Sequence, residues 1–152
     1  MSHTPHISVF GEMLWDLLPA GKQPGGAPMN VAVHLNNLGV ATSLISKVGQ
    51  DALGKDLLKF LQERNLPTDW IQIDSTHPTG TVNVNMDDAQ EVQYDIVVPV
   101  AWDFIAHEEA LVERVKASDV FVYETLAARE PTSRDTLISL LKVSKNNVLD
   151  VN

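Results

Sequence analysis

The sequence contains no cysteine among its 152 residues. This absence excludes disulfide bonds, thiol nucleophiles and cysteine-ligated metal sites, and it favours a reducing compartment. No stretch approaches the roughly 18 apolar residues of a membrane helix, and the first eleven residues lack a cationic segment followed by a long apolar run. We therefore expect a cytoplasmic protein that does not bind membranes.

Basic residues are also scarce. Eleven Lys and Arg stand against twenty Asp and Glu, which gives a formal net charge of −9. Nucleic acids and anionic membranes are bound by clustered Lys and Arg, so the charge argues against both partners. Hydrophobic residues make up 44% of the chain, enough for the core of one domain. A small molecule is the expected ligand.

Several common motifs are missing. No two glycines flank a single intervening residue, so the dinucleotide-binding fingerprint, which begins with Gly-x-Gly, is absent. Gly21 and Gly26 have the interval of a phosphate-binding loop, but Ala27 and Pro28 occupy the positions that require Lys and Ser or Thr. The five histidines show no metal-ligand spacing, so we expect no metal site in this chain.

Short apolar runs alternate with segments of helical period. The apolar runs that predict buried strands are 7–10, 42–48, 70–73, 120–123 and 148–151. Four segments have a helical period. The first follows a loop over 21–28, and the second follows Asp51, which can cap it. The other two cover 110–115 and 132–145. This alternation predicts an α/β fold, a parallel sheet with helices on both faces.

Three of these helices have a predicted apolar face. In the helix after residue 28 the face carries Val31, Leu35 and Leu38, and Gly39 is placed to end the helix. In the helix capped by Asp51 the apolar stripe is Leu53, Leu57, Leu58 and Leu61. In the helix over 132–145 the inward residues are Leu137, Ile138 and Leu141.

Residues 81–86 and 92–98 alternate between apolar and polar side chains, with a polar turn over 87–91 between them. Val82 and Val84 lie on the apolar side. An isolated two-stranded hairpin is marginal in water, so it should pack on the main body or on a second molecule. We expect a small antiparallel flap over about 79–98, joined by 12–18.

Polar groups that could bind a ligand gather near the predicted sheet edge. Gly25 and Gly26 allow close backbone approach, and Asn30 presents a donor and an acceptor near a helix start, which suits a polyol; a tight turn is the alternative. Asp16 could accept hydrogen bonds from two neighbouring hydroxyls, or could be a solvated or capping carboxylate. Glu124 and Asn152 each follow a predicted strand, and a loop cap and a chain-end residue are their alternatives.

The run 25–32, followed by Gly39 and Gly49, resembles the amino-terminal signature of the ribokinase-like, or phosphofructokinase B (PfkB), family of sugar kinases. Gly11-Glu12 leading to Asp16 resembles the first sugar-binding loop of that family, and 48–54 resembles the following loop. The hairpin stands where these enzymes carry a lid. The resemblance covers essentially the whole chain.

The resemblance implies site residues and an activity. By this resemblance, Asp16, Gly26 and Asn30 contact the sugar, and Gly25 shapes the loop. The lid residues Val82 and Val84 and the strand-end residue Glu124 also contact the sugar. Asn152 lies near the nucleotide phosphates. The family transfers a phosphoryl group from ATP to a sugar hydroxyl with Mg²⁺, using an aspartate in a Gly-x-Gly-Asp motif.

Neither that motif nor the magnesium-linked Asn-x-x-Glu of the family occurs here. An apolar strand at 148–151 would also need further neighbours in a parallel sheet. We therefore expect residues 1–152 to be the amino-terminal part of a single kinase domain, of fructokinase type, inactive alone because the catalytic base lies in the carboxyl-terminal half.

Two alternatives remain open. One is a noncatalytic sugar-binding module, or a fragment that forms a homodimer through its hairpin. The other keeps the kinase fold but uses a nucleoside or a keto-deoxy sugar acid as the acceptor. A sugar acid needs a cationic partner, for which Lys22 and Arg129 are the local candidates.

Overall fold

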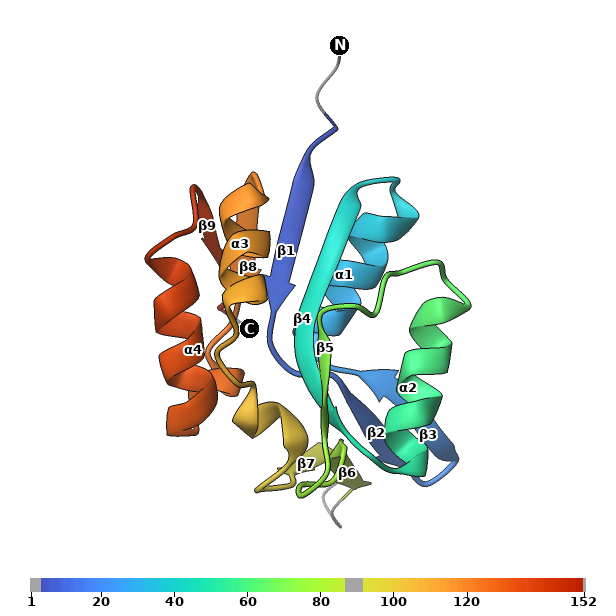
Figure 1. The fold of residues 1–152 in the computed structure, drawn as a ribbon. Coiled ribbons are helices and arrows are strands. Elements are labelled where there is room, and N and C mark those ends of the chain that lie inside the picture. The colour runs from blue at the N-terminus through green and yellow to red at the C-terminus, as the bar shows by residue number, and fades with distance from the viewer. Residues whose placement is uncertain (1–3, 87–91, 152) are drawn as a thin grey trace.

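The computed structural model describes residues 4–86 and 92–151, with backbone only at Met86. A five-stranded sheet with the order β5-β4-β1-β8-β9 forms the body, and each neighbouring pair is parallel (Figure 1). Its strands are β1 (His6–Phe10), β4 (Ala41–Gly49), β5 (Ile71–Asp74), β8 (Val120–Tyr123) and β9 (Asn147–Leu149). The four α-helices of the described residues are α1 (Ala27–Asn37), α2 (Ala52–Gln62), α3 (Glu109–Ala117) and α4 (Pro131–Leu141).

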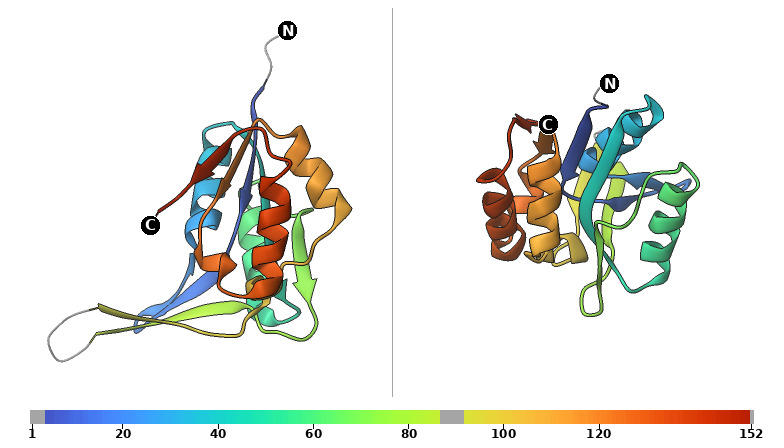
Figure 2. Two further views of the ribbon diagram at one scale, coloured as in Figure 1. Left: turned by 90° about the vertical axis from the view of Figure 1, so that its left-hand side faces the viewer. Right: turned by 45° about the horizontal axis from the view of Figure 1, so that its top comes forward.

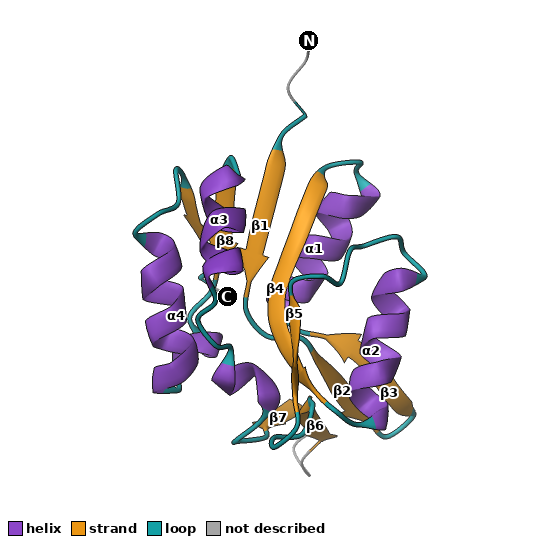
Figure 3. Ribbon diagram, in the orientation of Figure 1, coloured by secondary structure: helices purple, strands orange, loops and turns teal. Residues whose placement is uncertain are grey.

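The helices cover both faces of this sheet (Figure 3). Successive strand residues point to opposite faces, so β1 sends Val9 into one core and Phe10 into the other. The core with Val9 is closed by α1 and α2, and the core with Phe10 is closed by α3 and α4. The predicted α/β class is confirmed.

The local helix signals have mixed outcomes. Asp51 caps α2 as predicted, accepting a hydrogen bond from the Gly54 amide at 2.7 Å. Gly39 has a φ of 79° just beyond α1, as a helix stop requires. The burial of Leu38 was predicted wrongly: α1 ends at Asn37, and Leu38 is 79% exposed. Ile138 was also assigned wrongly, because α4 buries Leu137 and Leu140 and leaves Ile138 exposed.

A second, four-stranded sheet has the order β3-β2-β6-β7, and we call it the lid sheet, or lid. Its strands are β2 (Leu14–Leu18), β3 (Gly21–Gly25), β6 (Gly80–Met86) and β7 (Val92–Ile96). The β6–β7 hairpin is antiparallel as predicted, but β2 runs parallel to β6, so the lid sheet is mixed. The loop predicted over 21–28 is wrong at its start, since Gly21–Gly25 pairs with β2 as the edge strand β3, where Pro24 is tolerated.

The lid lies at the carboxyl ends of the body strands. Figure 1 shows β1 and β4 pointing toward it, and Figure 2 (left) shows it extending sideways from that edge of the body. In the body sheet, β9 is the edge strand next to β8, and its Val148 and Leu149 are exposed. No α-helix in the described part of the chain has the length and apolar character needed to span a bilayer.

Candidate functional site

One face of the lid sheet carries both apolar side chains and a carboxylate. Residues paired across neighbouring strands share a face, and the register pairs Asp16 with Val82, Val82 with Ile96, and Val84 with Tyr94. These five residues therefore lie on the same side of the lid, which we call the lid face. Val82 and Val84 are buried and pack with Leu14 in a small core.

The opposite side of the lid packs on α2. The Trp15 indole N–H donates to the Leu53 carbonyl at 3.0 Å, and the Lys22 ammonium lies 4.4 Å from the centre of a Trp15 ring. Lys22 also pairs with Asp56 on α2 at 2.5 Å. Because α2 covers this side, the lid face with Asp16 is the side that remains for a ligand.

A cleft of about 530 Å³ lies between the lid and the body. It is lined by Glu12, Ala27, Tyr94, Ile96, Glu124, Thr125 and Leu126. Tyr94 and Ile96 belong to the lid face, whereas Glu12 and Glu124 follow two neighbouring body strands. The cleft therefore lies at the carboxyl edge of a parallel sheet, where α/β proteins gather ligand groups.

Gly25 and Gly26 allow the chain to pass close to two acidic residues. A Cβ on Gly25 would stand 2.3 Å from Oδ2 of Asp16, and a Cβ on Gly26 would stand 2.6 Å from the Glu12 carbonyl oxygen. Gly26 has a φ of 104°, which favours glycine. Burial raises the pKa of Asp16. The two glycines thus fix the position of Asp16 and of the start of α1.

Asn30 lies in the first turn of α1, where its side chain is exposed and its backbone N–H donates to the Gly26 carbonyl at 2.9 Å. Its role toward a sugar remains a prediction, as do those of the other predicted site residues. Asn152 lies outside the described residues.

Sequence reasoning assigned no role to Glu12, which the structure places at the centre of the site. Its Oε1 accepts a hydrogen bond from the Ala27 N–H at 3.1 Å, and this bond caps α1 where Gly26 offers no side chain. Burial, a hydrogen bond with Glu124 and repulsion from Glu124 raise the pKa of Glu12 to about 9. The sequence holds one signal for this pair, because Glu12 and Glu124 both follow predicted strands. The structure adds that these strands, β1 and β8, are neighbours, with Phe10 paired with Tyr123.

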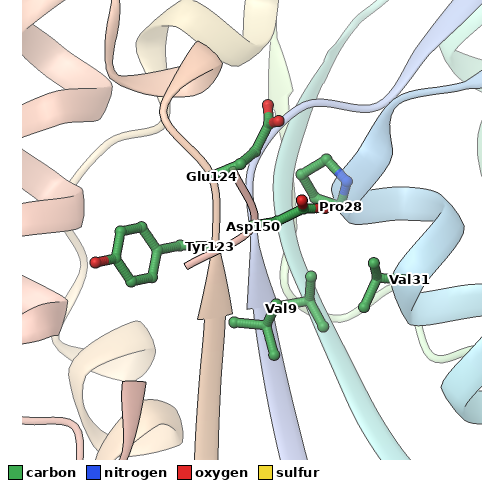
Figure 4. A pocket seen from close by; sticks show the side chains of 7 residues that line it. Val9, Pro28, Val31, Tyr123, Glu124 and Asp150 are labelled. Carbon is green, nitrogen blue, oxygen red and sulfur yellow. The ribbon is translucent and has the colours of Figure 1, made fainter. Parts of the chain in front are cut away.

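A narrower cavity lies beside Glu124. Figure 4 shows Glu124, Asp150 and Pro28 close together, with Val9 and Val31 beside them. The Asp150 N–H donates to the Tyr123 carbonyl at 2.9 Å, which fixes the chain after β9 beside the end of β8. Residue 150 therefore lies at the same sheet edge as Glu124.

The two cations considered for a sugar acid have other partners. Arg129 donates to both carboxylate oxygens of the fully buried Asp103, at 2.6 and 2.8 Å, and to the Val97 carbonyl at 2.8 Å. Lys22 lies on the side of the lid that faces α2. Neither residue lines the cleft.

The sequence pattern of the pfkB family of carbohydrate kinases matches residues 19–152. The chain is 36% identical to a protein of Pyrococcus horikoshii named "Putative sugar kinase PH1459", over 96% of this chain and 51% of that protein. It is 31% identical to a fructokinase of Salmonella typhimurium, over 88% of this chain and 45% of that enzyme.

Solved structures agree with these relatives. The crystal structure of the uncharacterized sugar kinase PH1459 matches with a TM-score of 0.84 and 30% identity, over 97% of this chain and 53% of that one. A fructokinase of Halothermothrix orenii matches with a TM-score of 0.81 and 26% identity, over 91% of this chain and 53% of that one. The chain spans about half the length of the relatives it matches. On the family match and the shared fold, this chain belongs to the pfkB family of carbohydrate kinases.

Proposed function

We propose that this chain supplies the sugar-binding and lid half of an ATP-dependent fructokinase. The observation that carries the proposal is the register of the lid, which puts Asp16 on the same face as the cleft-lining Tyr94 and Ile96. Relatives named fructokinase support the acceptor, and a neighbour 32% identical to this chain was crystallised in complex with ATP.

The residues of this chain would bind the sugar and exclude water. The Asp16 carboxylate accepts hydrogen bonds from neighbouring hydroxyls, while Glu124 and Asn30 add polar contacts and Gly25 and Gly26 let the backbone approach. Val82 and Val84 stiffen an apolar lid over the sugar. Excluding water from the site prevents phosphoryl transfer to water in place of the sugar.

The nucleotide half of the reaction is proposed for the complete protein. There, an aspartate beyond this chain acts as base, Asn152 approaches the phosphates and Mg²⁺ neutralises their charge. Within the described residues, no group of three or more His, Asp or Glu side chains could hold a metal ion, so we assign no step of this chain to the metal.

The proposal is tested by measuring ADP formation by the complete protein with fructose, ribose, adenosine and 2-keto-3-deoxy-D-gluconate. We expect fructose to give the highest kcat/KM. Faster turnover of adenosine would identify a nucleoside kinase instead, and no ADP formation with any acceptor would contradict a kinase.

One observation favours a second candidate, a homodimer formed through the lid. Val92, Tyr94 and Ile96 form an exposed apolar row on β7, beside the buried Val82 and Val84. A second copy could cover this row. Sedimentation of the complete protein over a hundredfold concentration range should show a dimer that Val92→Asp dissociates; a monomer at every concentration would contradict pairing.

A further inference from the structure

The carboxyl groups of Glu12 and Glu124 form a buried acidic pair. Glu12 is 2% exposed and Glu124 is 5% exposed. Oε2 of Glu12 and Oε1 of Glu124 are both buried, and neither accepts a hydrogen bond from an N–H or O–H donor of the described residues. Two neighbouring buried carboxylates, each with one oxygen that lacks a donor, are strongly unfavourable, because each loses hydration and repels the other.

A single proton between the two groups resolves this conflict. A protonated carboxyl donates one hydrogen bond, so the pair becomes a carboxylic acid bonded to a carboxylate, with one negative charge in total. Burial and the neighbouring Glu124 carboxyl raise the pKa of Glu12, in agreement with this arrangement. Oε1 of Glu12 still accepts from the Ala27 N–H at the start of α1.

Among the described residues, the linings of the cleft and of the narrower cavity contain no Lys, Arg or His. The other residues that line the cleft are Ala27, Tyr94, Ile96, Thr125 and Leu126. Tyr94 on β7 is the remaining titratable residue of that lining, and Asp150 after β9 lines the narrower cavity beside Glu124. The first turn of α1 contains no acidic residue. An anionic ligand would therefore meet two acidic groups without a compensating Lys or Arg from this lining.

We propose that Glu12 and Glu124 share one proton and together form the hydroxyl-binding floor of the cleft, which selects an uncharged sugar over a sugar acid. This inference rests on the proposed kinase function and adds Glu12 as a positioning residue that acts through Glu124. The proton is used within the pair, so the pair offers its remaining carboxylate oxygens as acceptors for the O–H donor of a sugar hydroxyl. Its remaining charge repels a carboxylate ligand.

Glu12→Gln is the informative variant. Gln keeps an oxygen for the Ala27 N–H and supplies an N–H for Glu124, so it copies the protonated form of Glu12 but does not titrate. Glu63→Gln is the matched control, because Glu63 is exposed and its carboxylate pairs with Lys59 one helical turn away. Both variants are compared with the wild type in the complete protein.

The first measurement is the unfolding temperature against pH. The folded protein holds a proton on Glu12 that the unfolded chain releases above about pH 4.5, so this contribution to stability is present in full below that pH and is lost as the pH rises toward 9. Between pH 6 and 9 the unfolding temperature of the wild type and of Glu63→Gln should fall by several degrees more than that of Glu12→Gln. Equal losses in all three proteins would overturn the shared proton.

The second measurement is the KM for fructose over the same range. In the wild type and Glu63→Gln, KM should rise about tenfold toward pH 9.5 as the pair gains its second charge, with a smaller change in kcat. Glu12→Gln should show no such rise in KM. If Glu12 only capped α1, its replacement by Gln would not remove the dependence of KM on pH. The same rise in Glu12→Gln would overturn the proposal.

The outcomes separate this inference from the proposed function. If fructose is not phosphorylated but Glu12→Gln flattens the stability profile, the shared proton is supported and the kinase assignment fails. If 2-keto-3-deoxy-D-gluconate has a lower KM than fructose, the selection of an uncharged sugar is wrong, whatever the stability profile shows.

Discussion

The Asp16 carboxylate lies directly against the backbone of Gly25 on the neighbouring strand of the lid. A methyl group at position 25 would stand 2.3 Å from Oδ2 of Asp16, closer than atoms can approach. Only a glycine leaves the carboxylate where it lies. The pair therefore couples the glycine-rich segment before α1 to the carboxylate that we propose binds sugar hydroxyls.

Gly25→Ala is predicted to weaken sugar binding without unfolding the protein. The added Cβ displaces a flexible side chain, so the stability cost should stay near 1 kcal/mol, whereas the displaced Asp16 should lose about tenfold in fructose affinity. Calorimetric titration of the complete protein measures the affinity. Lys22→Ala, on the same strand but facing α2, should bind fructose as the wild type does; equal losses in both variants would contradict the specific link to Asp16.

Arg129→Ala is predicted to destabilise the protein by about 3–5 kcal/mol, because it leaves the fully buried Asp103 without its cation. The denaturant midpoint measures this loss. The double variant with Arg129→Ala and Asp103→Ala should recover part of the stability that Arg129→Ala alone loses. If Arg129→Ala instead abolished turnover of a sugar acid and left the midpoint unchanged, Arg129 would be a ligand residue after all.

Asp74→Asn is predicted to lower stability at neutral pH by about 1.5–3 kcal/mol. Burial alone would raise the pKa of Asp74, but N–H donors of His77 and Thr76 and the Lys47 ammonium hold it well below its usual range. This stability is present above about pH 4 and is lost as the pH falls further.

Unfolding of Asp74→Asn should therefore depend less on pH below 4 than unfolding of the wild type. Asp69→Asn, at an exposed position just before β5, is the control and should behave as the wild type. An acid limb that Asp74→Asn leaves unchanged would show that other carboxylates dominate it.

Much of the body could be predicted from local signals. Asp51 accepts the Gly54 N–H across three residues, and such a cap is visible in the sequence. The alternation of apolar strands and helices also identified the parallel sheet, because each such strand is buried on both faces. By contrast, helical period alone could not decide that Leu38 lies past the end of α1 or that Ile138 faces solvent.

The lid and the acidic pair depend on contacts distant in sequence. Gly21–Gly25 has the composition of a loop, and it becomes a strand because β2 offers an unpaired edge. Glu12 is an ordinary glutamate after a strand until β1 and β8 become neighbours and bring it to Glu124. Parallel pairing between β2 and β6 likewise could not be predicted from the hairpin alone.

The most direct test of the account is the fructose affinity of the complete protein with Asp16→Ala, measured by calorimetric titration. Asp95→Asn is the matched control, since Asp95 pairs with Asn83 on the other side of the lid from Asp16. We predict a loss of roughly 1.5–3 kcal/mol, about 10- to 150-fold in affinity, for Asp16→Ala and no loss for Asp95→Asn. Unchanged fructose affinity in Asp16→Ala would contradict the claim that the lid face binds the sugar.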